Sequence, residues 1–177
     1  FTLDNGMVCL VCEDPSAPVV SIQIWVRTGS VHEREHLGAG LSHAIEHMIF
    51  KGTSARKPGD ITREINDAGG FINAYTSLDR TVFFADMPSD RWLTGLQVLA
   101  DAVMNASFPE SEWDLERLVI LREMAMNRDD PDTELSRLLW ESAFAVHPYR
   151  APVIGYEDIF SKITRDELAE FFRRCYT

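Results

Sequence analysis

The feature that most constrains the fold is a pair of β-rich runs set between helical patterns. FINAYTS (71–77) and RTVFFADMP (80–88) are rich in β-branched and aromatic residues, and only Leu78 and Asp79 separate them. Two strands so close along the chain are expected to pair as an antiparallel hairpin. PVVSIQIWVRTGS (18–30) alternates apolar and polar residues, which predicts a third strand with one buried face.

A fourth strand is expected near the amino terminus. Asn5 is followed by glycine, which is a two-residue turn signal, and MVCLVCED (7–14) after it is an apolar alternating run. Cys9 and Cys12 in this run are three positions apart, so on a strand they point to opposite faces and do not form a metal clamp. Together with Cys175 they are interpreted as reduced structural thiols, which favours the cytoplasm or an organelle matrix over the periplasm.

Most of the remaining sequence has the apolar periodicity of helices. Asp60 is a candidate cap of one helix, and Thr164 and Glu167 form a capping-box pattern at the start of the last one. Strands followed by helices, with one β-hairpin between helices, predict an α+β fold with an antiparallel or mixed sheet packed against helices. We expect one domain, residues 1–177. The expected helices are 38–50, 57–70, 89–105, 109–130, 130–148 and 164–175.

The charge of the chain limits the partners it can bind. Its 28 acidic residues against 17 basic ones give a net charge of −11, and the lysines and arginines form no cluster. Nucleic-acid-binding proteins usually carry a basic surface, so nucleic acid is not an expected partner. The acidic excess is typical of a solubilising surface, with a preference for basic partners as the alternative. No apolar run approaches the ~18 residues of a membrane span.

The sequence is expected to be part of a longer chain. It starts at Phe1 without a methionine and has no secretory signal pattern. It ends at FFRRCYT, directly after a predicted helix. A larger protein that has been truncated accounts for both features.

The segment GLSHAIEHMIFKGT (40–53) places three chemically active side chains on one helix. His43 and His47 are one turn apart on the same face, so both imidazoles can reach one tetrahedral zinc ion. Glu46 lies at the flank of that face, where its carboxylate can reach a water molecule without binding the metal. This H-x-x-E-H order is the inverse of the H-E-x-x-H zinc-peptidase motif, in which the glutamate is the general base. The alternative is a solvated helix face without a metal.

A catalytic zinc ion usually has three protein ligands, so the motif requires a partner elsewhere in the chain. Glu116 and Glu123 are seven positions apart on the predicted helix 109–130 and share one of its faces. One carboxylate can bind the metal while the other holds a histidine N–H. The alternative is that both acids pair with arginines on a solvated surface. The remaining histidines are not expected to be ligands, and the first two are assigned to a loop: His32, His36 and His147.

Residues 40–53 resemble the signature of the inverted-zincin metallopeptidases, the family of pitrilysin, insulysin and the mitochondrial processing peptidase β-subunit. The resemblance continues in order through INDAGGFINAYTSLDRTVFF, ERLVILREMAMNRDDPD and HPYRAPVIGYEDIFSKITRDELAEFFRRCY, so it covers nearly the whole chain. The family has a glutamate about 76 residues after its second motif histidine, and Glu123 stands at that distance from His47. The resemblance implies an amino-terminal zinc peptidase domain of the processing-peptidase-like branch.

The resemblance also implies roles for individual residues. The implied ligands of Zn2+ are His43, His47 and Glu123. Glu46 is the implied general base, and Glu116 is the supporting acid of the catalytic centre. FINAYTS matches the segment that pairs with an extended peptide substrate by strand addition, and an ordinary sheet strand is the alternative. The resemblance assigns this contact with the substrate to Asn73, Ala74 and Tyr75, and it places Asn73 to hydrogen-bond the substrate backbone.

The implied activity is hydrolysis of peptide bonds in extended peptides by metal-activated water. Family members that resemble this chain have a second, similar domain or a partner subunit, which closes over the zinc domain. These 177 residues do not contain it, so the isolated chain is expected to cleave poorly. One alternative is a non-catalytic zinc-binding or assembly subunit of the same family, and another is a purely structural zinc domain. Glu46 argues against both, since neither needs a base.

Overall fold

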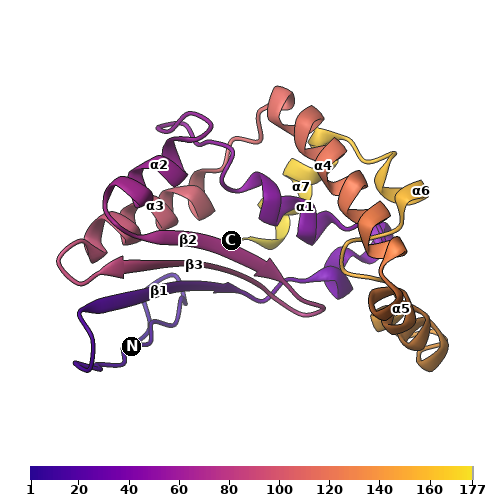
Figure 1. Ribbon diagram of the computed structural model, residues 1–177, viewed down its shortest axis with the longest axis horizontal. Helices are drawn as coiled ribbons and strands as arrows, with labels where there is room; N and C mark the ends of the chain where they lie inside the picture. Colours follow the sequence, from indigo (N-terminus) through magenta and orange to yellow (C-terminus); the bar gives the residue numbers. More distant parts are fainter. Residues whose placement is uncertain (177) are drawn as a thin grey trace.

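The fold is built on a three-stranded antiparallel sheet. A computed structural model describes residues 1–176, and its strands are β1 (Val19–Val26), β2 (Phe71–Thr76) and β3 (Thr81–Pro88). They lie in the order β1-β3-β2, with β3 in the centre (Figure 1). The predicted α+β class is confirmed, and so is the hairpin formed by β2 and β3.

Helices make up most of the remainder of the chain. The helices expected from the sequence are present with shorter bounds, and the capping box at Thr164 and Glu167 is formed. None of the helices in residues 1–176 is both long and apolar enough to cross a bilayer. The α-helices are α1 (Leu41–Met48), α2 (Asp60–Asp67), α3 (Trp92–Asn105), α4 (Glu110–Asp129), α5 (Pro131–Ala143), α6 (Glu157–Phe160) and α7 (Arg165–Cys175), and the 3-10 helices are η1 (Ser30–His36) and η2 (Pro148–Arg150).

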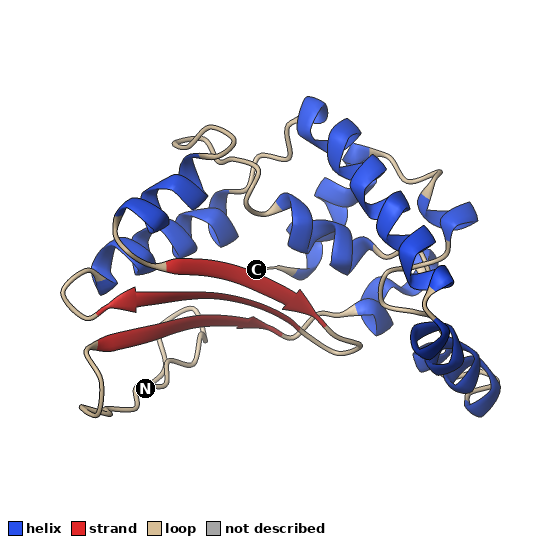
Figure 2. Ribbon diagram, viewed as in Figure 1, coloured by secondary structure: helices blue, strands red, loops and turns tan. Residues whose placement is uncertain are grey.

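The core lies between one face of the sheet and the helices α1, α2 and α3 (Figure 2), and it continues into residues of α4, α6 and α7. Alternate residues of β1 are half-buried and those between them are exposed, as the apolar alternation of this segment predicts. On β3, Phe83, Ala85 and Met87 are buried in the same apolar cluster as residues of the three helices. Removal of this apolar surface from water is the main stabilising term of such a fold. Because α1 also contacts β2, the motif segment lies beside an edge strand.

The amino-terminal end of α1 is fixed by a residue outside the helix. Its N-cap is Gly40, which has a φ of 72° and no side chain to cap the helix. A β-carbon at this position would collide with the carbonyl oxygen of Ile154, so both the backbone conformation and the space require glycine. Glu33, which is fully buried, accepts hydrogen bonds from the N–H groups of Gly40 and Ser42, both at 3.0 Å. These two N–H groups lie at the start of the helix, where backbone donors lack partners within the helix, so Glu33 holds the motif helix in place.

The predicted strand at residues 7–14 is wrong. The turn after Asn5 is present, and one isolated bridge pairs Thr2 with Val8. Beyond it, within the part of the chain that the structure describes, the segment pairs with no strand, and the side chain of Leu10 is 91% exposed. Strand propensity is realised only where a neighbouring strand accepts the backbone hydrogen bonds, and beyond Cys9 the described residues offer this segment no such neighbour.

The cysteines remain free thiols in residues 1–176. Cys9 is half-buried and Cys12 is exposed, and both lie in the irregular amino-terminal segment. Because neither residue lies on a strand, the two thiols are not separated by opposite strand faces as predicted. Cys175 lies half-buried at the end of α7.

Two local assignments from the sequence also differ from the structure. Asp60 is the first residue of α2 rather than its cap, because Gly59 occupies the N-cap and the Asp60 carboxylate accepts from the N–H of Lys57 at 2.9 Å. The predicted loop position of His32 and His36 is wrong, because both lie in the 3-10 helix η1. Short 3-10 segments often serve as connectors, so pattern alone does not distinguish them from loops.

Glu33 is expected to make the stability of α1 depend on pH. Burial raises the pKa of Glu33 from 4.5 to about 7, against the opposing effect of the backbone N–H groups of Ser42 and Gly40. Because the pKa is higher in the folded state, the stabilising contribution is complete below about pH 4.5 and is lost as the pH rises through 7. We expect ionisation of Glu33 to lower the free energy of unfolding of α1 by up to about 3 kcal/mol between these pH values.

Amide hydrogen exchange of α1, corrected for the pH dependence of the intrinsic rates, measures this loss. The loss should be absent in Glu33→Gln, which has no carboxylate to ionise. Glu35→Gln is the matched control, because Glu35 is exposed and pairs with Arg174 at the surface. The same pH-dependent loss in Glu33→Gln as in the wild type would contradict the assignment.

Candidate metal centre

The three predicted ligand side chains converge where α1 meets α4. His43 and His47 project from α1, and Glu123 projects from α4. Nε2 of His43 lies 3.6 Å from Oε1 of Glu123, and Nε2 of His47 lies 3.4 Å from its Oε2. One potential ligand atom from each residue lies within 4.8 Å of the other two. The structure thus brings together two local residues and one from a distant helix.

The donor set and its spacing fit a zinc ion. Two donors on a tetrahedral zinc ion are about 3.4 Å apart, since each bond to the metal is ~2.0–2.1 Å long. The two histidine nitrogens lie 3.6 and 3.4 Å from different oxygens of Glu123, and one donor atom from each residue lies within 4.8 Å of the other two, so the cluster is close to that spacing. Two imidazole nitrogens and one carboxylate are also the ligand types of catalytic zinc sites, in which water or substrate takes the fourth position.

Glu116 holds His47 from the side away from the cluster. Oε1 of Glu116 lies 2.8 Å from Nδ1 of His47, and Oε2 lies 2.6 Å from Nζ of Lys51. A histidine that donates its Nδ1–H to a carboxylate presents the lone pair of Nε2 to a metal. His43 lacks such support, because its Nδ1 is buried and finds no hydrogen-bond partner among residues 1–176.

Glu46 lies beside the cluster without belonging to it. Its Oε2 accepts a hydrogen bond from the Thr76 hydroxyl at 2.6 Å, and Thr76 is the last residue of β2. Glu46 and His47 line one cleft with a volume of about 290 Å³. A carboxylate in this position can exchange a proton with a water molecule in the cleft.

Burial and neighbouring charges set the protonation states around the cluster. Burial lowers the pKa of His43 to about 4, with a smaller effect from the other imidazole, so this ring is neutral at neutral pH as a metal ligand must be. Burial raises the pKa of Glu46. Burial lowers the pKa of His47, but hydrogen bonds to its two glutamate partners outweigh this effect, so its pKa is raised overall. These carboxylates favour a positive charge at His47, and a bound cation can supply that charge.

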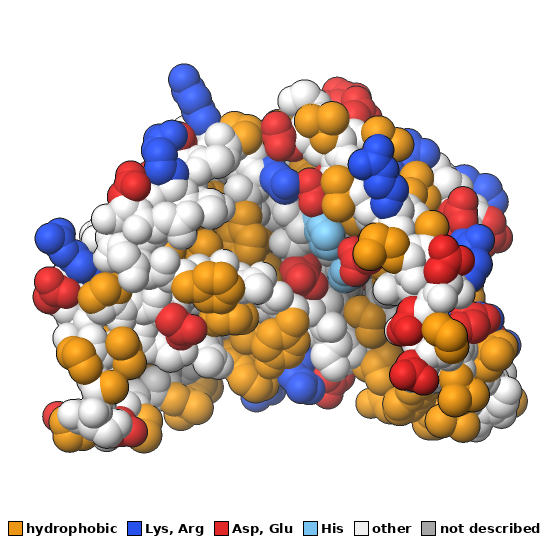
Figure 3. Space-filling view, in the orientation of Figure 1, with side chains coloured by type: hydrophobic (Ala, Val, Ile, Leu, Met, Phe, Trp, Pro, Cys, Tyr) orange, Lys and Arg blue, Asp and Glu red, His pale blue; other side chains and the backbone are white. Residues whose placement is uncertain are grey.

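The cluster opens onto a hollow beside the free edge of β2. Figure 3 shows the histidine side chains inside this hollow, with acidic and basic groups around them. Asn73 and Ala74 of β2 line the same cleft as Glu46 and His47. Tyr75 does not line this cleft, and its side chain is 39% exposed. In the described chain β2 pairs only with β3, so its other edge is available to a further strand.

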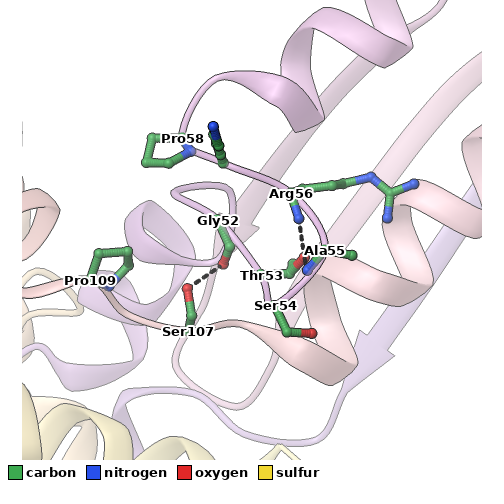
Figure 4. A pocket seen from close by; sticks show the side chains of 9 residues that line it. Gly52, Thr53, Ser54, Ala55, Arg56, Pro58, Ser107 and Pro109 are labelled. Carbon is green, nitrogen blue, oxygen red and sulfur yellow. Dashed lines mark hydrogen bonds between the residues drawn. The ribbon is translucent and has the colours of Figure 1, made fainter.

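A second cleft, of about 280 Å³, is formed by the loop between α1 and α2 (Figure 4). Residues 52–58 provide most of its lining. The guanidinium of Arg56 is bound by Glu64 at 3.1 Å and by Asp101 at 2.6 Å, so its charge is already satisfied. No histidine lines this cleft among the described residues, and it offers no metal site.

Three residues that shape the site are missed by the sequence analysis: Glu33, Lys51 and Thr76. Lys51 continues the four-residue spacing of the two motif histidines, and Thr76 is a polar residue on the inward side of β2, so each carries a usable signal. Glu33 carries none, because its partners are backbone groups seven and nine residues away. The three other histidines lie outside the cluster: His32, His36 and His147.

One peptidase family matches most of the chain. The sequence profile described as insulinase (peptidase family M16) matches residues 8–157. The chain belongs to the insulinase family. The matched segment includes the histidine motif of α1 and the acidic face of α4, so the resemblance inferred from these residues is confirmed.

Two named relatives align over nearly the whole chain. It is 32% identical to the uncharacterized zinc protease YmxG of Bacillus subtilis, over 100% of this chain and 43% of that protein. It is 35% identical to the probable mitochondrial-processing peptidase subunit beta of Arabidopsis thaliana, over 99% of this chain and 33% of that protein. The chain therefore spans less than half the length of these relatives.

A solved structure has the same fold. A protease from Helicobacter pylori superimposes with a TM-score of 0.85 and 26% sequence identity, over 90% of this chain and 39% of that one. This likeness extends the family assignment from sequence to three-dimensional structure.

Proposed function

We propose that this chain is the metal-binding part of a zinc-dependent endopeptidase, in which His43, His47 and Glu123 hold the zinc ion. The observation that carries the proposal is the convergence of both Nε2 atoms on one carboxylate, 3.6 and 3.4 Å from its oxygens. Family membership and the zinc protease among the relatives support it. Zinc, when bound here, supplies a Lewis acid that polarises a peptide carbonyl and lowers the pKa of a water molecule.

Glu46 is the general base in this proposal. Burial raises its pKa, which brings it closer to the neutral range where a carboxylate both takes and returns a proton efficiently. The Thr76 hydroxyl holds one carboxylate oxygen at 2.6 Å and leaves the other free for the attacking water. Glu46 then delivers the proton to the leaving amine.

Glu116 has a supporting role that it exerts through His47. By accepting the Nδ1–H at 2.8 Å, it leaves Nε2 as the ligand atom and fixes the plane of the ring. Glu116 and Glu123 both belong to α4, so the same bond also sets where Glu123 stands relative to the histidines.

The substrate is proposed to bind as an added strand along the free edge of β2. An extended peptide can pair with the open backbone groups of an edge strand without strict sequence requirements. Asn73 and Ala74 line the cleft that contains Glu46, so a peptide on this edge passes the base. Oδ1 of Asn73 accepts from the N–H of Ala74 at 2.9 Å, and a substrate strand would replace this local bond. Tyr75 has weaker support, because it lies outside the cleft.

A second, similar domain or a partner subunit is proposed to complete the enzyme. The named relatives and the solved protease are more than twice as long as this chain, which covers 43%, 33% and 39% of them. An opposing domain would enclose the hollow over the cluster and exclude bulk water, which strengthens electrostatic interactions in the site. The chain alone is therefore expected to bind zinc and to cleave slowly.

The competing function is that of a zinc-binding or assembly subunit without hydrolysis, and a purely structural zinc site is the other alternative. Glu46 distinguishes these from the peptidase. Its carboxylate is oriented by Thr76 toward the cleft, next to His47. A scaffold or a structural site does not need an oriented base there, so this arrangement favours the enzyme.

Replacement of Glu123 by Gln is expected to remove zinc. The amide cannot supply the anionic oxygen, so affinity should fall by more than the ~10–100-fold typical of changes outside the ligand set. Metal analysis and chelator competition on the full-length protein measure the effect, with about one zinc per chain expected in the wild type. Asp114→Asn, an exposed position on the same helix, is the control that should keep its zinc. Undiminished zinc affinity in Glu123→Gln would refute the ligand assignment.

Replacement of Glu46 by Gln is expected to abolish turnover and to leave zinc bound. Loss of a general base costs ~10²–10⁴-fold in rate, while the three ligands are untouched. A fluorogenic peptide assay on the full-length protein, with and without chelator, gives the rate. Turnover equal to wild type in this variant would reject Glu46 as the base. Zinc binding without any turnover in the wild type would favour the assembly subunit.

The Thr76 hydroxyl is expected to set the acid limb of the pH–rate profile. Its hydrogen bond stabilises ionised Glu46 and so lowers the pKa that burial has raised. Without it, the base is protonated at higher pH, so the acid limb of kcat should move to higher pH in Thr76→Val. On the acid limb itself the rate should fall roughly tenfold, which corresponds to one hydrogen bond to a charged group. Thr76→Ser keeps the hydroxyl and should restore the profile, whereas an unshifted limb in Thr76→Val would show that the bond does not tune the base.

A further inference from the structure

Lys51 extends the hydrogen-bonded chain that leads away from His47. It follows the carboxyl end of α1, where its N–H donates to the carbonyl oxygen of Met48 at 3.0 Å. Its ammonium reaches across to α4 and lies 2.6 Å from Oε2 of Glu116. The other oxygen of the same carboxylate lies 2.8 Å from Nδ1 of His47. One carboxylate therefore joins an ammonium group to an imidazole of the cluster.

Burial makes this pair different from an ordinary surface ion pair. The side chain of Glu116 is 10% exposed and that of Lys51 is 31% exposed. A buried carboxylate that loses one of two partners keeps an unsatisfied oxygen, and it can rotate to find another donor. Two partners on opposite oxygens fix the carboxylate plane, and the geometry of the bond to His47 depends on that plane.

We propose that Lys51 is a positioning residue of the metal centre that acts through Glu116. Its ammonium holds the carboxylate in the orientation that accepts the Nδ1–H of His47, and this directs Nε2 of His47 at the metal. His43 has no hydrogen-bond partner for its own Nδ1 among the described residues. The hydrogen bonds that orient the two histidine ligands are therefore those made to His47. This inference depends on the proposed zinc site and assigns a role to a residue outside it.

A direct contact with substrate is the competing role for Lys51. Lys51 lines the same cleft as Glu46 and Asn73, so its stem borders the proposed path of the peptide. The ammonium itself is bound to Glu116 at 2.6 Å, which favours positioning over substrate binding. The two roles separate in measurement, because positioning changes zinc affinity whereas substrate binding changes KM.

The test uses Lys51→Met, which keeps the length of the side chain and removes its charge. We expect zinc affinity of the full-length protein, measured by chelator competition, to fall roughly tenfold, at the lower end of the range for groups that orient a ligand. At saturating zinc, KM should stay unchanged. Lys51→Arg keeps a cation for the carboxylate and should recover most of the affinity. Lys57→Met is the matched control, because Lys57 is an exposed lysine of the following loop.

A double-mutant cycle shows whether Lys51 acts through Glu116. In a Glu116→Gln background, Lys51→Met should change zinc affinity less than about twofold, because the carboxylate it would orient is already gone. A tenfold effect that persists in this background overturns the proposal. So does unchanged zinc affinity in Lys51→Met combined with a raised KM, which would assign Lys51 to the substrate.

Failure of this proposal is distinguishable from failure of the zinc site. Wild-type protein that binds no zinc would overturn the proposed function and the role of Lys51 with it. Wild-type protein that binds zinc, together with Lys51→Met that binds it equally well, would overturn the role of Lys51 alone.

Discussion

The contact between α1 and α4 is the interaction on which the site depends. The hydrogen bond between His47 and Glu116 joins residues 69 positions apart in the chain. Glu116 belongs to the buried stripe of α4, together with Trp113, Ile120 and Met124. The apolar members of this stripe belong to the core, and the one acidic member reaches the motif helix. Packing of the core therefore determines the spacing of the metal-binding atoms.

The part of the site that the sequence predicts is the part set by helix periodicity. The pairing of His43 with His47, and of Glu116 with Glu123, follows from residues that recur on one face of a helix, and the structure places all four at one junction. The fold class follows in the same way from the order of strand and helix patterns. These features depend on local geometry, so a single sequence is sufficient to derive them.

The features that sequence reasoning misses depend on tertiary contacts. Thr76 and Glu33 acquire their roles from groups that only the folded chain brings near them. The amino-terminal run 7–14 shows the opposite error, because its alternation is that of a strand but the described chain offers it no partner. Local preference describes what a segment can form, and its neighbours decide whether it does.

The close backbone packing at the start of α1 has a consequence for the order of folding. Gly40 lies directly against the backbone of Ile154, and Gly155 against that of Ala39, so the start of the motif helix is completed by a segment far along the chain. Contacts between such remote segments form slowly, because the intervening loop must close first. We therefore expect nascent chains to acquire a competent metal site only after residues 154–155 have been synthesised and docked. Metal binding would then occur only in chains in which these two segments have docked. Shorter nascent chains would hold no metal.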